Sequence, residues 1–335
     1  MIGGPMEYIE RGVGWKWMAI LFAVFGVIAS IGTGNLVQVN SIVESVNIIF
    51  NIEPWIVGLF VAILTAMVIL GGVKSIGHVS AVLVPVMAIF YIGGGMIIII
   101  SNVHLLPEVF TQIFVFAFKG QAAFGGFAGA SIMMAIQMGV SRSIFSNEAG
   151  LGISSIAAAA AKTDHPGRQA MITMVGALIS TLIVCTITGL VIAISGVLGT
   201  QDASGKMLNG AALALTAFSS KITGGAYIVA IGLFLFAFST VIAWGYYGEK
   251  CFEYLFGERA VLPFRIFFTI AVIPGAILKL ETVWAFADVA NGLMVIPNLI
   301  ALILLSSVIG KETESFITLI HHEKHRKAGS NDQCG

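Results

Sequence analysis

Charge is the property this chain has least of. Only 10% of its 335 residues are Asp, Glu, Lys or Arg, whereas 58% are hydrophobic, and its mean hydropathy is +0.98. Soluble domains carry charge on about a quarter of their residues, so the composition excludes that class. The basic and acidic residues balance at 17 each, which gives no sign of nucleic acid as a partner. The composition indicates a polytopic membrane protein.

Cysteine is also scarce. Cys185, Cys251 and Cys334 lie far apart in the sequence, so we expect neither a disulfide framework nor a metal-ligand cluster built on thiolates. Nor does the sequence contain a recognisable nucleophile and base pair or a cluster of metal ligands of the kind that marks an active site. We therefore do not expect an enzyme.

Long uncharged stretches fill most of the chain. A spanning helix needs about 20 mostly apolar residues, and we count about eight candidate crossings. We predict an all-α protein with a membrane domain over 17–310, a cytoplasmic interfacial loop over 1–16 and a basic cytoplasmic tail over 311–335. The candidate crossings are 17–43, 54–73, 79–103, 120–161, 169–197, 224–248, 260–278 and 282–310.

Lysine and arginine are distributed unevenly between the predicted loops. With the N-terminus placed in the cytoplasm, the inner loops hold most of these residues, and such an excess is typical of the cytoplasmic side. We expect both termini in the cytoplasm and the protein in the cell membrane. The basic tail over 321–327 suits the anionic headgroups of membrane lipid.

The fourth candidate crossing is interrupted by polar residues. Its segment 137–152 contains Arg142, Asn147 and Glu148, and the apolar residues after it are too few to cross a bilayer alone. A charged side chain at bilayer depth costs about 2.5 to 3.5 kcal/mol on insertion scales and faces protein or a water-filled cavity. Broken helices of this kind expose backbone to solutes and ions in transporters. We predict unwound backbone near 137–152 beside a solute cavity.

Two further crossings carry polar side chains. Gln38 has a bulky amide that both donates and accepts hydrogen bonds, which favours a binding role over helix packing. Ser239 and Thr240 are adjacent in a phenylalanine-rich crossing. Their hydroxyls could bond back to carbonyls one turn earlier, or they could coordinate a hard cation, which prefers oxygen ligands. The residues alone leave both interpretations open.

Three motifs carry a family resemblance. They are Gly3-Gly4-Pro5-Met6-x-Tyr8-Ile9-Glu10, Gly32-x-Gly34-Asn35-x-Val37-Gln38-x-Asn40-Ser41 and Ser146-Asn147-Glu148-Ala149-Gly150-Leu151-Gly152. With them the chain resembles the alanine or glycine:cation symporter family (sodium:alanine symporters) over essentially its whole length. The resemblance implies a leucine-transporter-like fold of two inverted five-helix repeats. The interrupted crossing then corresponds to the sixth core helix, the crossing with Gln38 to the third, and the one with Ser239 and Thr240 to the eighth.

The chain also departs from the family pattern. Members of the family carry two further helices before the Gly-Gly-Pro-Met motif, so we expect a fold that lacks the first two core helices, an N-terminal truncation, and a missing N-terminal helix pair as a partner. Glu7 stands where the family pattern leads us to expect an aromatic residue. An impaired carrier, half of a split transporter, or a non-transporting membrane scaffold are the alternatives.

The resemblance implies sodium-coupled symport of a small neutral amino acid, alanine or glycine, by alternating access. We expect Gln38, Gln137 and Ser141 to hydrogen-bond the solute, and Met138 and Gly139 to bound a small pocket. Arg142, Asn147 and Glu148 are expected to act in gating or structural pairing. The hydroxyls of Ser239 and Thr240 are expected to bind the co-transported sodium ion.

Overall fold

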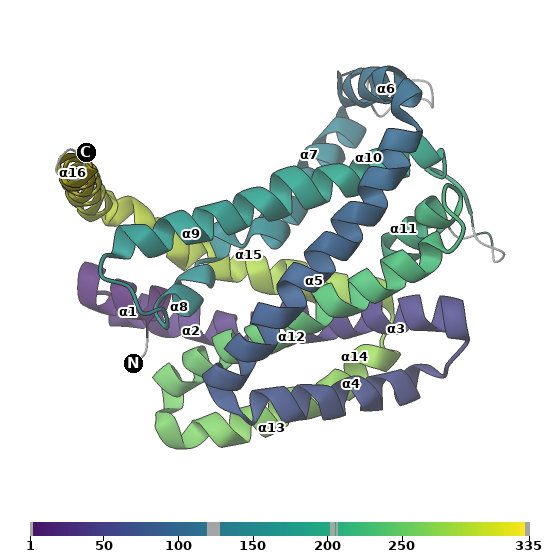
Figure 1. Cartoon of the computed structure of the whole chain (residues 1–335). Coiled ribbons are helices and arrows are strands. Elements are labelled where there is room, and N and C mark those ends of the chain that lie inside the picture. The colour runs from purple at the N-terminus through teal and green to yellow at the C-terminus, as the bar shows by residue number, and fades with distance from the viewer. Residues whose placement is uncertain (1–2, 119–127, 202–204, 206, 332–335) are drawn as a thin grey trace.

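The computed structural model describes residues 3–118, 128–201, 205 and 207–331, and most of that part is helical. No strand occurs among these residues; one isolated bridge joins Gln201 and Met207. The prediction of an all-α protein is confirmed. The helices form one interlocked bundle, with α9 and α5 crossing over the layer that contains α2 and α12 (Figure 1).

Six helical segments among the described residues are long and apolar enough to cross a membrane. They are Lys16–Phe50, Gly72–Ser101, Pro166–Ser195, Gly225–Phe256, Glu258–Ile277 and Leu280–Leu304. The chain is therefore a multi-pass membrane protein. The count of eight crossings stays a prediction, because Pro54–Ile69 is shorter and part of the fourth candidate, 119–127, lies outside the described residues.

The helices of the first half are often joined without a loop. In chain order they are α1 (Pro5–Tyr8), η1 (Ile9–Val13), α2 (Lys16–Ile31), η2 (Gly32–Leu36), α3 (Val37–Phe50), α4 (Pro54–Ile69), α5 (Gly72–Ser101), η3 (Val103–Leu105), α6 (Leu106–Phe118), α7 (Ala128–Asn147), η4 (Ala149–Leu151) and α8 (Ser154–Ala158). Pro54 opens α4, where its fixed φ suits the first helical turn, and Asn51 ends α3 in the left-handed conformation.

The second half begins with a long helix that contains a π-helical stretch. Its elements are α9 (Pro166–Leu178), η5 (Ile179–Cys185), α10 (Thr186–Ser195), α11 (Gly210–Ser219), α12 (Gly225–Phe256), η6 (Glu258–Ala260), α13 (Val261–Ile270), α14 (Val272–Ile277), α15 (Leu280–Leu304) and α16 (Ser306–Asn331). Gly196 ends α10 with a φ of 73°, a conformation that glycine adopts without a steric cost.

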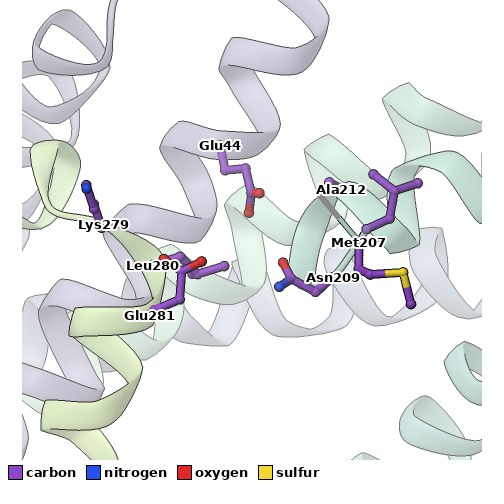
Figure 2. Close-up of a pocket in the computed structure, with 8 residues that line it drawn as sticks. Glu44, Met207, Asn209, Ala212, Lys279, Leu280 and Glu281 are labelled. Atoms are coloured by element: carbon purple, nitrogen blue, oxygen red, sulfur yellow. The ribbon is translucent and has the colours of Figure 1, made fainter. Parts of the chain in front are cut away.

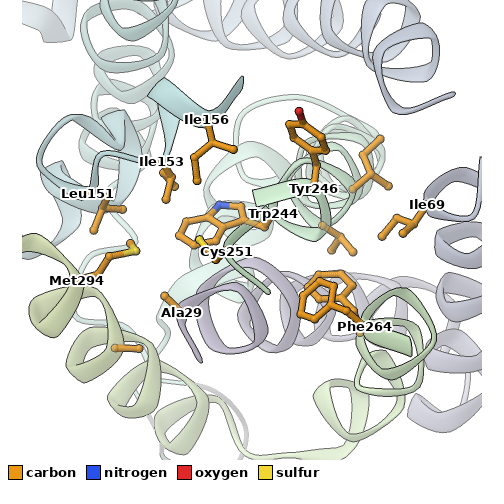
Figure 3. Packing of buried hydrophobic residues seen from close by; sticks show 14 of the residues in the cluster. Ala29, Ile69, Leu151, Ile153, Ile156, Trp244, Tyr246, Cys251, Phe264 and Met294 are labelled. Atoms are coloured by element: carbon orange, nitrogen blue, oxygen red, sulfur yellow. The ribbon is translucent and has the colours of Figure 1, made fainter. Parts of the chain in front are cut away.

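Helix α12 is the centre of the bundle and packs against α2, α3 and α5. Small residues permit the close approach: a Cβ added at Gly248 would lie 2.2 Å from Ser30 Oγ, and one added at Gly245 would lie 2.5 Å from Ile69. Membrane helices associate through such small residues because lipid offers no hydrophobic drive between them. The buried side chains around Trp244 and Phe264 fill the space between the helices (Figure 3).

The described segments near the two ends of the chain are helical, and each contacts the bundle. The opening segment, predicted as an interfacial loop, forms α1 and η1, and its Met6 and Ile9 are fully buried. The predicted tail belongs to α16, which starts before it at Ser306. Glu323 on α16 forms an ion pair with Arg168 at the start of α9, so the first part of the tail is attached to the protein.

Candidate functional site

The segment predicted as the fourth crossing breaks just after α7. Asn147 is the last residue of that helix, Glu148 follows with a φ of 56°, and Gly152 has a φ of 80°. A positive φ is uncommon for a residue with a side chain, and it turns the chain here instead of continuing the helix. The short helix α8 then starts at Ser154.

This break is narrower than the one predicted at 137–152. Residues 137–147 belong to regular helix, because a glycine inside a helix costs only about 1 kcal/mol relative to alanine and Gly139 is therefore tolerated there. Gln137 and Gly139 are exposed, and Met138 is 50% exposed. A Cβ added at Gly139 would meet no atom within 4 Å, so the space beside this glycine is open within the described chain.

A cavity of about 580 Å³ lies beside the break. It brings together Glu148 from the break and Ser239 and Thr240 from α12, three residues that the sequence selected for separate reasons. The other lining residues are Val73, Ile76, Gly77, Ser80, Val84, Ala157, Ala160, Ala161, Ala243, Tyr246 and Tyr247. The wall is therefore mostly apolar, with a few polar groups that converge, which is typical of small-molecule sites.

The two hydroxyls on α12 already have hydrogen-bond acceptors. Ser239 Oγ donates to the carbonyl of Phe236 at 2.8 Å, and Thr240 Oγ1 donates to the same carbonyl at 2.9 Å. This is the back-bonding that the sequence left open as one of two alternatives. Donation uses the hydroxyl hydrogen but leaves the oxygen lone pairs available, so the arrangement is compatible with a cation ligand as well.

Glu148 is held in the cavity by a buried indole. Trp244 Nε1 donates to Glu148 Oε1 at 3.2 Å, and Trp244 is 2% exposed. The indole fits because Gly34 lies against it: a Cβ on Gly34 would be 2.1 Å from Trp244 Cβ. Gly34 belongs to the π-helical segment η2, and single π-helical turns are frequent at functional sites.

Gln38 lies two residues after the end of that segment. Its Nε2 donates to the carbonyl of Thr33 at 3.1 Å, a carbonyl that the wider π-helical turn leaves without its usual α-helical partner. Neighbouring polar residues are also engaged, since Thr33 Oγ1 donates to Asn291 Oδ1 at 2.9 Å. Gln38 is partly buried, and in this structure its amide stabilises the helix.

Ser141 and Arg142 on α7 converge on one carboxylate. Ser141 Oγ donates to Asp288 Oδ1 at 3.1 Å, and Arg142 donates to Asp288 Oδ2. The guanidinium carbon also lies 4.1 Å from the centre of the Trp284 ring, within cation–π range. Sequence reasoning anticipated pairing for Arg142 but missed Asp288 as its partner; the signal was an isolated acid in another apolar crossing. Asn147 donates more locally, to Ser143 Oγ at 3.4 Å.

The opening segment packs directly against the break. Tyr8 donates its hydroxyl hydrogen to Asn298 Oδ1, and Asn298 Nδ2 donates to the carbonyl of Gly150 at 2.9 Å. A Cβ added at Gly152 would lie 2.7 Å from Pro5 Cγ, so glycine is required by both φ and space. Two of the sequence motifs therefore meet in space, which sequence reasoning did not foresee.

A second cavity, of about 490 Å³, adjoins the first through four shared lining residues, Val73, Ala160, Ala161 and Tyr246. Its wall also contains a buried ion pair, in which Arg265 Nε lies 2.7 Å from Glu249 Oε2. Arg265 Nη2 donates to the other carboxylate oxygen at 3.1 Å, so the pair is bidentate. Glu249 is only 3% exposed, and sequence reasoning missed this pair altogether.

A third cavity, of about 540 Å³, lies between the middle of α3, the start of α11 and the start of α15. Glu44, Asn209 and Glu281 project toward it (Figure 2), and Lys279 also lines it. The set is polar and of mixed charge, and it contains none of the residues that the sequence selected for binding. It does not share a lining residue with the cavity at the break.

The long apolar helices define a polytopic membrane protein, and the break after α7 lies beside a cavity. The model of the sodium:alanine symporter family matches residues 1–331. The chain belongs to that family, as its motifs indicated. The family and its named members are transporters, not enzymes, and amino-acid transport is the function class.

Several relatives extend this similarity. The chain is 48% identical over 320 residues to the sodium/alanine symporter AgcS of Methanococcus maripaludis, covering 94% of this chain and 69% of AgcS. It is 46% identical over 317 residues to an uncharacterized transporter of Haemophilus influenzae, with the same two coverages. It is 38% identical over 340 residues to YrbD of Bacillus subtilis, a putative sodium/proton-dependent alanine carrier protein, covering 98% of this chain and 68% of YrbD.

Proposed function

We propose that this protein carries out sodium-coupled symport of a small neutral amino acid, alanine or glycine, across the cell membrane. The observation that carries the proposal is the meeting of Glu148, Ser239 and Thr240 on one cavity beside the helix break. The relative AgcS, 48% identical, is named a sodium/alanine symporter, which supports alanine as the first substrate to test.

The ion part of the proposal rests on oxygen ligands. Ser239 and Thr240 supply hydroxyl oxygens on one cavity wall, and sodium, like other hard cations, prefers such ligands. The helix break adds backbone groups at a helix end, which transporters of this kind use for solutes and ions. Bound sodium would favour the solute-competent state, and the coupling between the two ligands would be reciprocal.

The solute part concerns Gln38, Gln137, Met138, Gly139 and Ser141. We propose Gln38 and Ser141 as hydrogen-bonding groups that change partners when the solute binds. Gln137, Met138 and Gly139 lie in an exposed stretch of α7, and we propose that Gln137 hydrogen-bonds the solute there while Met138 and Gly139 bound a small pocket. A small pocket would select by steric exclusion, which separates solutes that differ by one methylene by about 1 to 3 kcal/mol.

Alternating access requires contacts that open in turn. We propose that the contact of Ser141 and Arg142 with Asp288 closes one side of the cavity, and that the contact of Tyr8 with Asn298 and Gly150 closes the other.

Both termini would lie in the cytoplasm, with the end of α16 against anionic lipid headgroups.

The test is uptake of radiolabelled alanine by proteoliposomes that contain the purified chain. An inward sodium gradient should drive accumulation, an equal choline gradient should not, and unlabelled glycine should compete more strongly than unlabelled leucine. Equal uptake in sodium and choline would contradict sodium coupling. If vesicles with and without the protein took up alanine equally, the result would favour the alternative of a scaffold without transport activity.

A further inference from the structure

Glu148 differs in charge from the rest of its cavity. Of the fourteen described lining residues, it is the only acidic one, and no Lys, Arg or His is among them. The two tyrosines, Tyr246 and Tyr247, are neutral at that pH. Glu148 therefore lies in a cavity without a basic side chain on its described wall.

A neutral hydrogen bond does not compensate this charge. Trp244 donates one N–H to Glu148 Oε1, but an indole supplies no positive charge. An uncompensated carboxylate at bilayer depth is costly, about 2.5 to 3.5 kcal/mol on insertion scales, and such residues pair with an opposite charge. The described wall provides no basic partner, so a cation in the cavity would be the counter-charge of Glu148.

The geometry of α12 places oxygen ligands near this carboxylate. Thr240 and Trp244 are four residues apart, so they share a face of the helix about one turn from each other. Trp244 holds the carboxylate, and Thr240 and Ser239 line the same cavity. A carboxylate with two hydroxyls gives a set of oxygen ligands with one negative charge, which matches a monovalent hard cation.

We propose that Glu148 is the charged ligand of the transported sodium ion and binds it together with the hydroxyls of Ser239 and Thr240. Trp244 is the positioning residue, because it orients the carboxylate through Nε1 and is itself fixed against Gly34. This inference rests on the proposed sodium coupling and adds the charge-balancing group that the hydroxyls lack.

Binding is measured apart from transport by thermal unfolding of the purified full chain in detergent. The midpoint is recorded in sodium chloride and in choline chloride at equal ionic strength. A ligand that binds only the folded state raises the midpoint, so the wild type should be stabilised by sodium. Glu148→Gln keeps the size and the acceptor for Trp244 but removes the charge, and its sodium-dependent shift should disappear.

Three other variants separate the contributions. Glu148→Asp keeps the charge and should retain a sodium-dependent shift at higher concentrations. Thr240→Val and Trp244→Phe should each weaken the apparent sodium affinity severalfold. Glu312→Gln removes an exposed carboxylate on α16 and should leave the sodium response unchanged.

Two outcomes would overturn the inference. One is a wild type without sodium-dependent stabilisation, and the other is Glu148→Gln with the affinity of the wild type. Glu148→Gln could also have a higher unfolding midpoint than the wild type in choline. If sodium then raised that midpoint as much as it does in the wild type, the result would count as the second outcome. Sodium stabilisation that depends on Glu148 in a chain that fails to transport alanine would support this ion site and contradict the proposed function instead.

Discussion

The hydroxyl of Tyr8 donates a hydrogen bond to Asn298 Oδ1, across 290 positions of sequence. The amide nitrogen of the same Asn298 donates to the carbonyl of Gly150, so one side chain connects the start of the chain to the helix break. Pro5 lies against Gly152 in the same region. The backbone of the break is therefore fixed by a segment far from it in sequence.

Tyr8→Phe removes the hydroxyl and leaves Asn298 Oδ1 without this donor. An unsatisfied buried polar group costs about 1 to 3 kcal/mol, so the thermal midpoint in detergent should fall by a few degrees. Tyr227→Phe is the matched control, because Tyr227 is 53% exposed, and it should change little. Equal midpoints for wild type and Tyr8→Phe would show that this contact does not stabilise the break.

Gly34→Ala places a methyl group where Trp244 lies, with the new Cβ 2.1 Å from Trp244 Cβ. Overpacking of this kind costs about 1 to 3 kcal/mol, and displacement of the indole should also reduce alanine uptake. Gly176→Ala is the control: it lies in helix α9 and its added Cβ meets nothing within 4 Å. That variant should be neutral or slightly more stable, since alanine is the better helix former.

Arg142 and Asp288 should show coupling in a double-mutant cycle. Arg142→Gln and Asp288→Asn each leave one charge without its partner, whereas the double variant leaves none. Both side chains are about a third exposed, at 37% and 34%, so solvent reduces the effect below that of a fully buried pair. We expect each single variant to lower the unfolding midpoint and uptake, and the double variant to recover part of the stability. Strictly additive losses would contradict the pairing.

Glu249→Gln should be among the most destabilising single substitutions in the chain. It removes the charge that faces Arg265 in a bidentate pair whose acid is 3% exposed. Removing one partner of a buried pair costs about 3 to 5 kcal/mol because the other charge stays buried. The measurement is the unfolding midpoint, with the exposed Glu312→Gln as control. A loss no larger than that of the control would show that Arg265 finds another partner.

The sequence predicted the class of fold well, because its signals are local. Long apolar runs and isolated polar residues gave an all-α membrane protein, and the glycines and Glu148 marked a helix break. The position of that break was predicted too far toward the N-terminus, since Arg142 and Ser141 suggested unwound backbone. In the structure these two residues stay helical and instead contact Asp288.

The site was only partly predictable, because its other contacts join distant segments. Nothing local in the sequence showed that Trp244 would reach Glu148, that Tyr8 would reach Asn298, or that Arg265 would pair with Glu249. The packing of α12 through the bundle determines the first and third of these contacts. Residue chemistry identified Ser239 and Thr240 as candidates, but their shared cavity with Glu148 became visible only in three dimensions.

The most direct test of sodium-coupled transport measures both fluxes in the same proteoliposomes. Labelled sodium and labelled alanine are followed together while an inward sodium gradient is imposed, and a sodium ionophore is then added to collapse the gradient. We predict that alanine accumulates above its external concentration, that sodium influx rises when alanine is present, and that the ionophore releases the accumulated alanine. Alanine entry that only equilibrates, with sodium influx independent of alanine, would contradict the account.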